Sequence, residues 1–142
     1  SQVSDRLQIV SQSGNVTDNS SARVIDELNL TVAQSPGASN IDLNQTTVEL
    51  VGTGGQESFE LGGSESTINI FTGSDTDVVL TSSSDRADIG IDLSATDYND
   101  PDRYLEGGDS LSVTFTTPSG ATTTAELRVP TTLTDEQDSV RL

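Results

Sequence analysis

Hydrophobic and polar residues alternate at every second position along most of the chain. Leu28, Leu30 and Val32, for example, are separated by Asn29 and Thr31. Successive side chains of a β-strand point to opposite faces, so this pattern predicts a strand with one buried and one exposed face. A helical periodicity of about 3.6 residues does not emerge convincingly anywhere. The alternation therefore predicts an all-β protein.

Eight further segments repeat the alternation, which brings the expected total to about nine short strands. Clusters of Gly, Pro, Ser and Asp separate them, and strands punctuated by turns in this way are typical of an antiparallel β-sandwich. The apolar positions of these segments are Leu7 and Ile9, Val48 and Leu50, Phe59 and Leu61, Ile68 and Ile70, Val78 and Leu80, Ile89 to Leu93, Leu111 to Phe115, and Ala125 to Val129.

The clearest hairpin runs from Leu111 to Val129. Two β-branched runs flank Pro118-Ser119-Gly120, and the glycine supplies the backbone freedom that a tight turn needs. Residues 72–88 are rich in Ser, Thr and Asp and are expected to contain a mobile loop. The length of 142 residues and the uniform composition predict a single domain, residues 1–142.

Charge changes the picture of the surface. The chain has 23 acidic residues against six basic ones, every basic residue is Arg, and the net charge is −17. Such a chain repels itself in dilute buffer, whereas at molar salt the Debye length falls to about 3 Å and the repulsion is screened. We infer a protein from an extreme halophile, with hydrated cations around its carboxylates. Six scattered Arg do not form the basic patch that nucleic-acid binding requires.

The missing residue types exclude most catalytic chemistry. Cys, His, Met, Trp and Lys are absent, which removes disulfides, thiolate and imidazole metal sites, Ser-His pairs and Schiff bases. Paired carboxylates remain possible in principle, but five aromatic residues offer little of the stacking surface that sugar hydrolysis uses. We expect no enzyme and no cofactor. No segment approaches the roughly 20 apolar residues of a membrane span, so no membrane contact by this segment is expected.

Four Asn-x-Ser/Thr sequons are candidate glycan acceptors of a secreted protein, at Asn15, Asn19, Asn29 and Asn44. The alternation places Asn29 on the outward face of its strand, and Asn15 and Asn19 are expected in a turn. A chain this rich in Ser and Thr would contain roughly two sequons by chance, so four is a mild excess. We expect at least one to carry an N-linked glycan.

A run of oxygen-bearing side chains offers a weak candidate metal site. The residues are Asp97, Asn99, Asp100, Asp102 and Asp109, with Glu106 beside the last. Their chemistry suits Ca²⁺, but Pro101 stands where a third ligand of an EF-hand should be and the required glycine is missing. Solvated loop carboxylates are the alternative.

Several segments together resemble haloarchaeal archaellins, the archaeal flagellins. The likeness spans most of the chain and is weakest between about residues 53 and 84; its motifs are strand patterns rather than catalytic signatures. The segments that carry it are Ser1 to Ser11, Ile25 to Val32, Ser35-Pro36-Gly37, Ile41-Asp42-Leu43, Gly107-Gly108-Asp109, Leu111 to Phe115, and Pro118 to Thr123.

The resemblance implies an immunoglobulin-like outer domain of an archaellum filament subunit that supports swimming outside the cell. Its partners would be copies of itself or a paralogous subunit, and members of the family are often glycosylated on Asn. The family also has an apolar amino-terminal assembly helix, which is missing from this sequence. The chain begins Ser1-Gln2-Val3 without Met, so we expect a shortened piece of a longer protein.

A second hypothesis has the same fold but a different function. An immunoglobulin-like module of a pilin or cell-surface protein, which binds a ligand or mediates adhesion, would satisfy the same strand pattern, because fold does not determine function. An apolar helical run encoded directly before Ser1 favours the filament subunit, whereas another sandwich repeat or a long linker favours the adhesive module.

Overall fold

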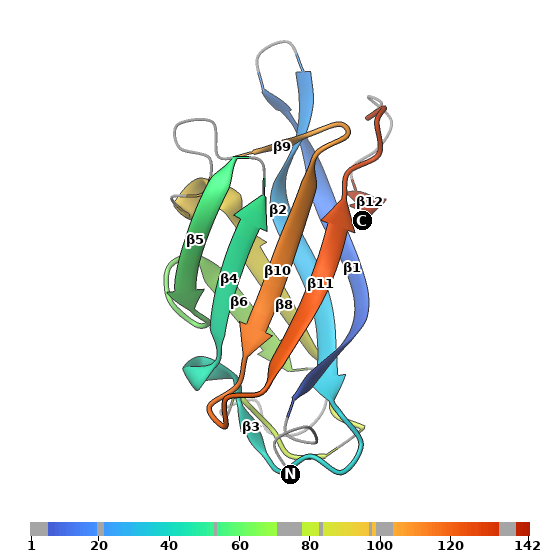
Figure 1. Cartoon of the computed structure of the whole chain (residues 1–142). Helices are drawn as coiled ribbons and strands as arrows, with labels where there is room; N and C mark the ends of the chain where they lie inside the picture. Colours follow the sequence, from blue (N-terminus) through green and yellow to red (C-terminus); the bar gives the residue numbers. More distant parts are fainter. Residues whose placement is uncertain are drawn as a thin grey trace.

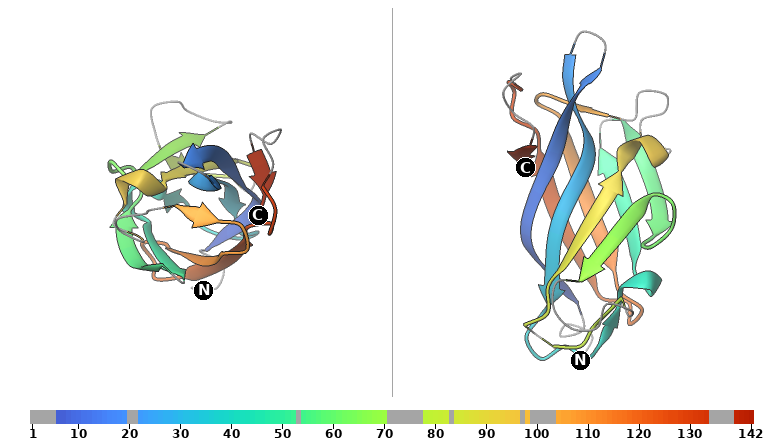
Figure 2. Two further views of the ribbon diagram at one scale, coloured as in Figure 1. Left: turned by 90° about the horizontal axis from the view of Figure 1, so that it is seen from above. Right: turned by 180° about the vertical axis from the view of Figure 1, so that it is seen from behind.

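Two antiparallel sheets face each other across one core in the computed structural model (Figure 1), which describes residues 6–19, 22–52, 54–70, 78–82, 84–96, 98, 104–133 and 139–142. Seen along its length, the molecule has both sheets wrapped around that core (Figure 2). The predicted antiparallel immunoglobulin-like β-sandwich is confirmed.

The larger sheet has the strand order β12-β1-β2-β8-β6, with β9 paired to β2. Its strands are β1 (Leu7–Asn19), β2 (Ala22–Gln34), β6 (Ser66–Ile70), β8 (Ala87–Asp92), β9 (Leu105–Glu106) and β12 (Ser139–Arg141). The smaller sheet has the order β11-β10-β4-β5. Its strands are β4 (Thr47–Gly52), β5 (Gly55–Glu60), β10 (Ser110–Thr116) and β11 (Thr122–Arg128), and a short pair joins β3 (Ile41–Asp42) to β7 (Val79–Leu80).

Each of the nine predicted alternations lies in or overlaps a strand. The apolar residues of β2, β8 and β10 are almost completely buried, as the period of two requires, and the hairpin around Pro118-Ser119-Gly120 joins β10 to β11. Residues 72–77, the first part of the expected mobile loop, lie outside the described residues, whereas Val79 and Leu80 form β7 and Ala87 and Asp88 belong to β8. The short strands β3, β9 and β12 were not predicted, because two or three residues carry no periodic signal.

A β-bulge explains why β1 is much longer than its sequence pattern suggests. Ile9 pairs with Val32 and Ser11 with Thr31, so Val10 has no partner in β2. The extra residue changes which positions face the core. Leu7 and Ile9 face inward before the bulge, and Gly14 and Val16 pack inward after it. A strict period of two misses this switch.

Two copies of the pattern Ile-Asp-Leu-x-x-Thr form the same local structure. In η1 (Leu43–Gln45) the Asp42 carboxylate accepts a hydrogen bond from the Asn44 amide, and in η2 (Leu93–Ala95) Asp92 accepts one from Ser94, both at 3.0 Å. A short polar side chain before a helical turn satisfies an amide that has no helical partner. In both copies the leucine is fully buried, so each turn caps a strand and closes the core.

The phenol of Tyr98 closes the core beside the β4–β5 hairpin. Tyr98 is 1% exposed, and its hydroxyl accepts a hydrogen bond from the Gly54 amide at 3.2 Å. Burial raises the pKa of Tyr98; the Gly54 hydrogen bond lowers it, and the nearby Asp109 carboxylate raises it. A Cβ on Gly52 would overlap the Tyr98 hydroxyl and lie 2.8 Å from the Ser110 carbonyl oxygen. This close approach explains the glycine in the strand.

Gly52→Ala is therefore expected to lower the free energy of unfolding by roughly 1–3 kcal/mol, measured by denaturant unfolding at molar salt. Gly63→Ala is the matched control, because its new methyl would meet mainly the mobile carboxylate of Glu65, and a change within about 0.5 kcal/mol is expected. Adding Tyr98→Phe should reduce the cost of Gly52→Ala, since the overlapping hydroxyl is gone. If Gly52→Ala lowered the free energy of unfolding equally with and without Tyr98→Phe, this account would be contradicted.

Candidate functional site

The outer face of the larger sheet carries two of the predicted glycan acceptors. Asn29 Nδ2 donates to Asn15 Oδ1 at 3.2 Å, and Asn15 Nδ2 donates to Glu27 Oε1 at 2.6 Å. All three side chains are half-buried. Asn29 lies on the outward face of β2, as predicted from the alternation, because its neighbours Leu28 and Leu30 are buried. The placement of Asn15 in a turn was wrong, because β1 continues through it to Asn19 and pairs Asn15 with Glu27.

The other two acceptors lie in different surroundings. Asn19 is the last residue of β1 and pairs with Ala22, the first residue of β2, so it lies at the end of a strand and not in the turn that was expected. The paired strands of this hairpin project beyond the rest of the molecule at one end (Figures 1 and 2). Asn44 lies in η1 with an exposed side chain. The four sequons are therefore spread over the surface and do not form one site.

Three carboxylates on the larger sheet, next to this polar chain, are near enough to influence one another electrostatically. Glu27 pairs directly with Asp92 of β8, and Asp26 is the extra residue of a second bulge, between Asn15 and Val16 of β1. Burial raises the pKa of Glu27, and the neighbouring Asp26 and Asp92 carboxylates raise it further. Burial also raises the pKa of Asp26, a backbone hydrogen bond opposes the shift, and Asp92 adds to it. The ionised forms of Asp26 and Glu27 therefore work against folding.

Glu27→Gln is expected to stabilise the protein at neutral pH by roughly 0.2–1 kcal/mol, because the amide keeps an acceptor for Asn15 and removes a repelled charge. The pKa of Glu27 is higher in the folded state than its ordinary value of 4.5. The protonated Glu27 carboxyl therefore contributes fully to the free energy of unfolding below that ordinary value, and this contribution is lost as the pH rises through the folded-state pKa. The gain should vanish in acid.

The measurement is the melting temperature of both proteins as a function of pH at constant salt. Glu106→Gln, at an exposed position of β9, is the control, for which no change is expected. A destabilised Glu27→Gln variant at neutral pH would show that the Asn15 bond to the charged carboxylate outweighs the repulsion.

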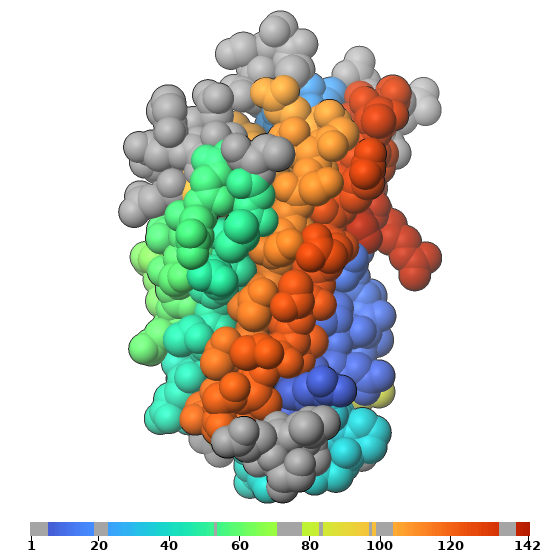
Figure 3. Space-filling model, viewed as in Figure 1, coloured from blue at the N-terminus to red at the C-terminus, as the bar shows by residue number. Residues whose placement is uncertain are grey.

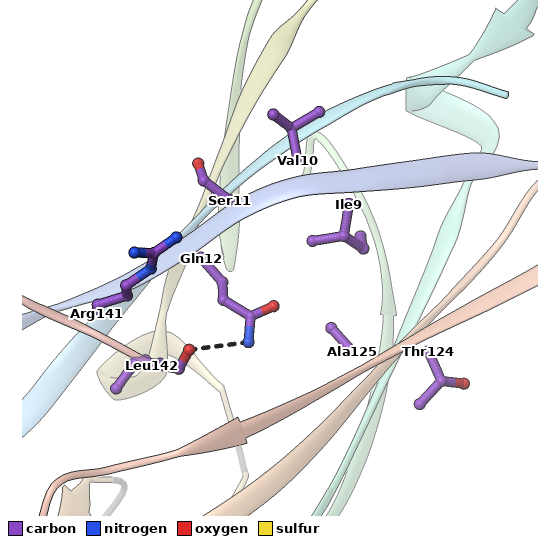
Figure 4. A pocket seen from close by; sticks show the side chains of 8 residues that line it. All are labelled: Ile9, Val10, Ser11, Gln12, Thr124, Ala125, Arg141 and Leu142. Atoms are coloured by element: carbon purple, nitrogen blue, oxygen red, sulfur yellow. Dashed lines mark hydrogen bonds between the residues drawn. The ribbon is translucent and has the colours of Figure 1, made fainter. Parts of the chain in front are cut away.

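A groove lies where the two sheets meet without a hydrogen-bonded ladder. We call Leu7–Gln12 of β1, Thr122–Arg128 of β11 and Ser139–Leu142 the β1–β11 seam. The strands lie side by side on the surface (Figure 3), but no ladder joins β1 to β11, and β12 pairs only with Ser13, Gly14 and Asn15. The groove has a volume of about 300 Å³. Its lining, drawn in Figure 4, consists of Ile9, Val10, Ser11, Gln12, Thr124, Ala125, Arg141 and Leu142.

Side chains bridge the β1–β11 seam where the backbone does not. Gln12 Nε2 lies 3.0 Å from the Leu142 carbonyl oxygen (Figure 4) and 3.1 Å from that of Glu126, and it donates to both. At the other end, the Thr123 hydroxyl donates to the Leu7 carbonyl at 2.6 Å. Between these bridges Val10 is 50% exposed. The groove therefore offers an exposed apolar side chain beside strand edges that lack a partner strand.

The candidate metal ligands are not brought together in the part of the chain that the structure describes. Asp97, Asn99, Asp100 and Asp102 lie outside it. Asp109 lies in the turn before β10, where its carboxylate accepts a hydrogen bond from the Glu106 amide at 2.9 Å. Among the described residues, no three acidic side chains are grouped suitably for a metal ion, and no helix is long and apolar enough to cross a membrane. The calcium site stays a prediction.

Comparison with known proteins identifies close relatives. The model of the family described as archaeal-type flagellin matches residues 1–133. Flagellin B1 of Natrialba magadii is 40% identical over 146 residues, which cover 99% of this chain and 73% of the relative. Flagellin B2 of Halobacterium salinarum is 35% identical over 140 residues, covering 95% of this chain and 69% of the relative.

Solved structures share the fold at low sequence identity. The crystal structure of archaeal flagellin FlaB1 from Methanocaldococcus jannaschii superimposes with a TM-score of 0.77 at 15% identity and covers 95% of this chain and 94% of that one. The structure of the archaeal flagellum of Methanospirillum hungatei superimposes with a TM-score of 0.65 at 13% identity. It covers 93% of this chain and 70% of that one. The archaellum periplasmic stator protein FlaG from Sulfolobus acidocaldarius superimposes with a TM-score of 0.51 at 20% identity. It covers 86% of this chain and 98% of that one. Because this fold also occurs in a stator protein, the sequence relatives decide the family.

Proposed function

The chain belongs to the archaeal-type flagellin family, and we propose that residues 1–142 form the single, solvent-facing domain of an archaellum filament subunit adapted to high salt. The family role is structural: the subunit helps to build the extracellular filament that cells use to swim. The observation that carries this conclusion is the 40% identity to a haloarchaeal flagellin over nearly the whole chain.

The mechanism that we propose is mechanical and colloidal. The two hydrogen-bonded sheets supply a stiff unit that repeats along the filament. The net charge of −17 gathers water and hydrated cations at its surface and keeps neighbouring filaments apart in brine. We propose no catalytic activity, because the side chains needed for nucleophilic and imidazole chemistry are absent from the sequence.

N-linked glycans form part of the proposal, and the surroundings of the sequons rank them. Asn44 is exposed, so its side-chain amide can be reached from solvent. Asn15 and Asn29 each donate through Nδ2, and a glycosylated amide retains one N–H, so these two accept a glycan only through the second Nδ2 position. We propose Asn44 as the preferred acceptor in the folded domain. An intact mass of the natural protein equal to the bare polypeptide mass would overturn the glycan proposal.

Immunogold electron microscopy tests the filament assignment against the adhesive alternative. Antibodies raised against this chain are expected to label filaments along their length on cells of the source organism. Cells whose filaments have been sheared off provide the control, which should lose the label. Labelling of the cell envelope with bare filaments would support a surface module and contradict the filament role.

A further inference from the structure

We propose that neighbouring copies of this chain meet side by side, with the β1–β11 seam of one copy against the outer edge of β5 on the next. The proposal rests on the proposed function for one premise, that copies assemble side by side. The new element is the identity of the two surfaces that meet. Charge, strand edges and the positions of the two surfaces each support it.

Three Arg side chains lie along the β1–β11 seam of this strongly negative chain, one just before its start and two towards its far end. Arg6 precedes β1, Arg128 ends β11, and Arg141 lies in β12 and lines the groove. All three are exposed, and in the described part of the chain none has an ion-pair partner. Glu126 is the single acidic side chain in the seam. Half of the six Arg residues of the chain therefore lie along one side of the domain.

The segment that forms β4, β5 and β6 on the opposite side has only acidic residues among its charged residues. Residues 47–70, which form the β4–β5 hairpin, the following turn and β6, contain Glu49, Glu57, Glu60 and Glu65 and no basic residue. β5 lies at one margin of the molecule, and β11, β1 and β12 lie at the other (Figure 1). The two sides therefore have opposite charge, and complementary potentials favour one docking orientation over others.

Both surfaces also present strand edges. β5 is the last strand of its sheet, so among the described strands none pairs with its outer edge. Across from it on the next copy, β1 lacks a partner strand between the Thr123 bridge at Leu7 and the start of β12 pairing at Ser13. Free edges are templates for pairing with another chain, and main-chain hydrogen bonds supply affinity in such contacts.

The geometry of the contact suits a filament. Because the two surfaces differ and lie on opposite sides, their contact is heterologous, and repeated heterologous contacts build an open row or helix rather than a closed dimer. At molar salt only Arg and Glu side chains in direct contact still attract, since the Debye length is about 3 Å. Strand-edge hydrogen bonds persist there.

Cysteine cross-linking in assembled filaments tests the contact directly, because the chain has no cysteine of its own. Ser11 lines the groove and Ser58 lies on β5, and both are exposed. Filaments of the complete subunit carrying Ser11→Cys and Ser58→Cys are expected to give a ladder of disulfide-linked oligomers after mild oxidation. Each single variant should give none. The control pair Ser11→Cys with Thr67→Cys, at an exposed position of β6, should also give none.

Three cross-linking results would overturn the proposal: filaments without a ladder from the Ser11 and Ser58 pair, an equal ladder from the control pair, or dimers from Ser11→Cys alone, which indicate a symmetric contact. Absence of the subunit from filaments would instead contradict the proposed function.

Charge reversal gives an independent measurement. Arg141→Glu and Glu60→Arg should each lower filament yield, and the two together should restore it, whereas Glu106→Arg should have no effect. A combined variant no better than either single one would count against the contact.

Discussion

Replacing Phe115 with alanine is expected to lower the free energy of unfolding by about 3–5 kcal/mol. Phe115 is completely buried in β10, where it pairs with Val48 of β4 and Thr123 of β11. The substitution removes apolar contact and leaves a cavity that the two hydrogen-bonded sheets cannot fill by moving together. Domains of this size are stable by about 5–15 kcal/mol, so the loss is a large share of the total.

Denaturant unfolding at molar salt, followed by tyrosine fluorescence and circular dichroism, measures this effect. Thr114→Ala is the matched control on the neighbouring residue, which points outward and contacts Thr124 through a hydroxyl pair at 3.0 Å. A loss below about 1 kcal/mol is expected there. Similar losses in both variants would show that β10 does not bury the face assigned to it.

Transfer from molar salt to nearly salt-free buffer is expected to unfold the protein or to lower its melting temperature by tens of degrees. The Debye length grows from about 3 Å at 1 M to about 30 Å at 0.01 M, so the 23 carboxylates then repel one another across the whole domain. The repelled group formed by Asp26, Glu27 and Asp92 is a local instance of this effect.

The measurement is a series of thermal melts at decreasing KCl concentration, with sucrose at low salt as the control. Sucrose stabilises by exclusion from the surface but does not screen charge. Recovery by KCl and not by sucrose supports screening. A melting temperature that is the same with and without salt would contradict the proposed adaptation to brine.

Particular residues show which parts of the fold the sequence predicts. Leu28, Leu30 and Val32 are all fully buried, because the alternation alone decides which face of a long strand is apolar. Leu7 and Ile9 identify the beginning of β1, but the bulge at Val10 shifts the pattern and hides the strand's continuation to Asn19. The repeated Ile-Asp-Leu-x-x-Thr pattern is visible in the sequence but was not used to predict the two capped turns. Only their structure reveals what it does.

The candidate surfaces were harder to predict, because they combine residues that are distant in the chain. Arg6, Arg128 and Arg141 look scattered in the sequence and come to lie along one side of the domain only because β1, β11 and β12 are neighbours. Likewise, Glu27 and Asp92 become neighbours through the pairing of β2 with β8. Such positions depend on sheet order, which local alternation does not encode.

Mass spectrometry of purified filaments tests the central claim, that this chain is a filament subunit, most directly. Trypsin cleaves here only after Arg, because the chain has no Lys, so residues 87–103 and 129–141 form two diagnostic peptides. Filaments sheared from swimming cells and washed in brine should yield both peptides in amounts comparable to those of other filament proteins. Their absence from filaments, together with their recovery from the cell envelope of the same culture, would contradict the claim.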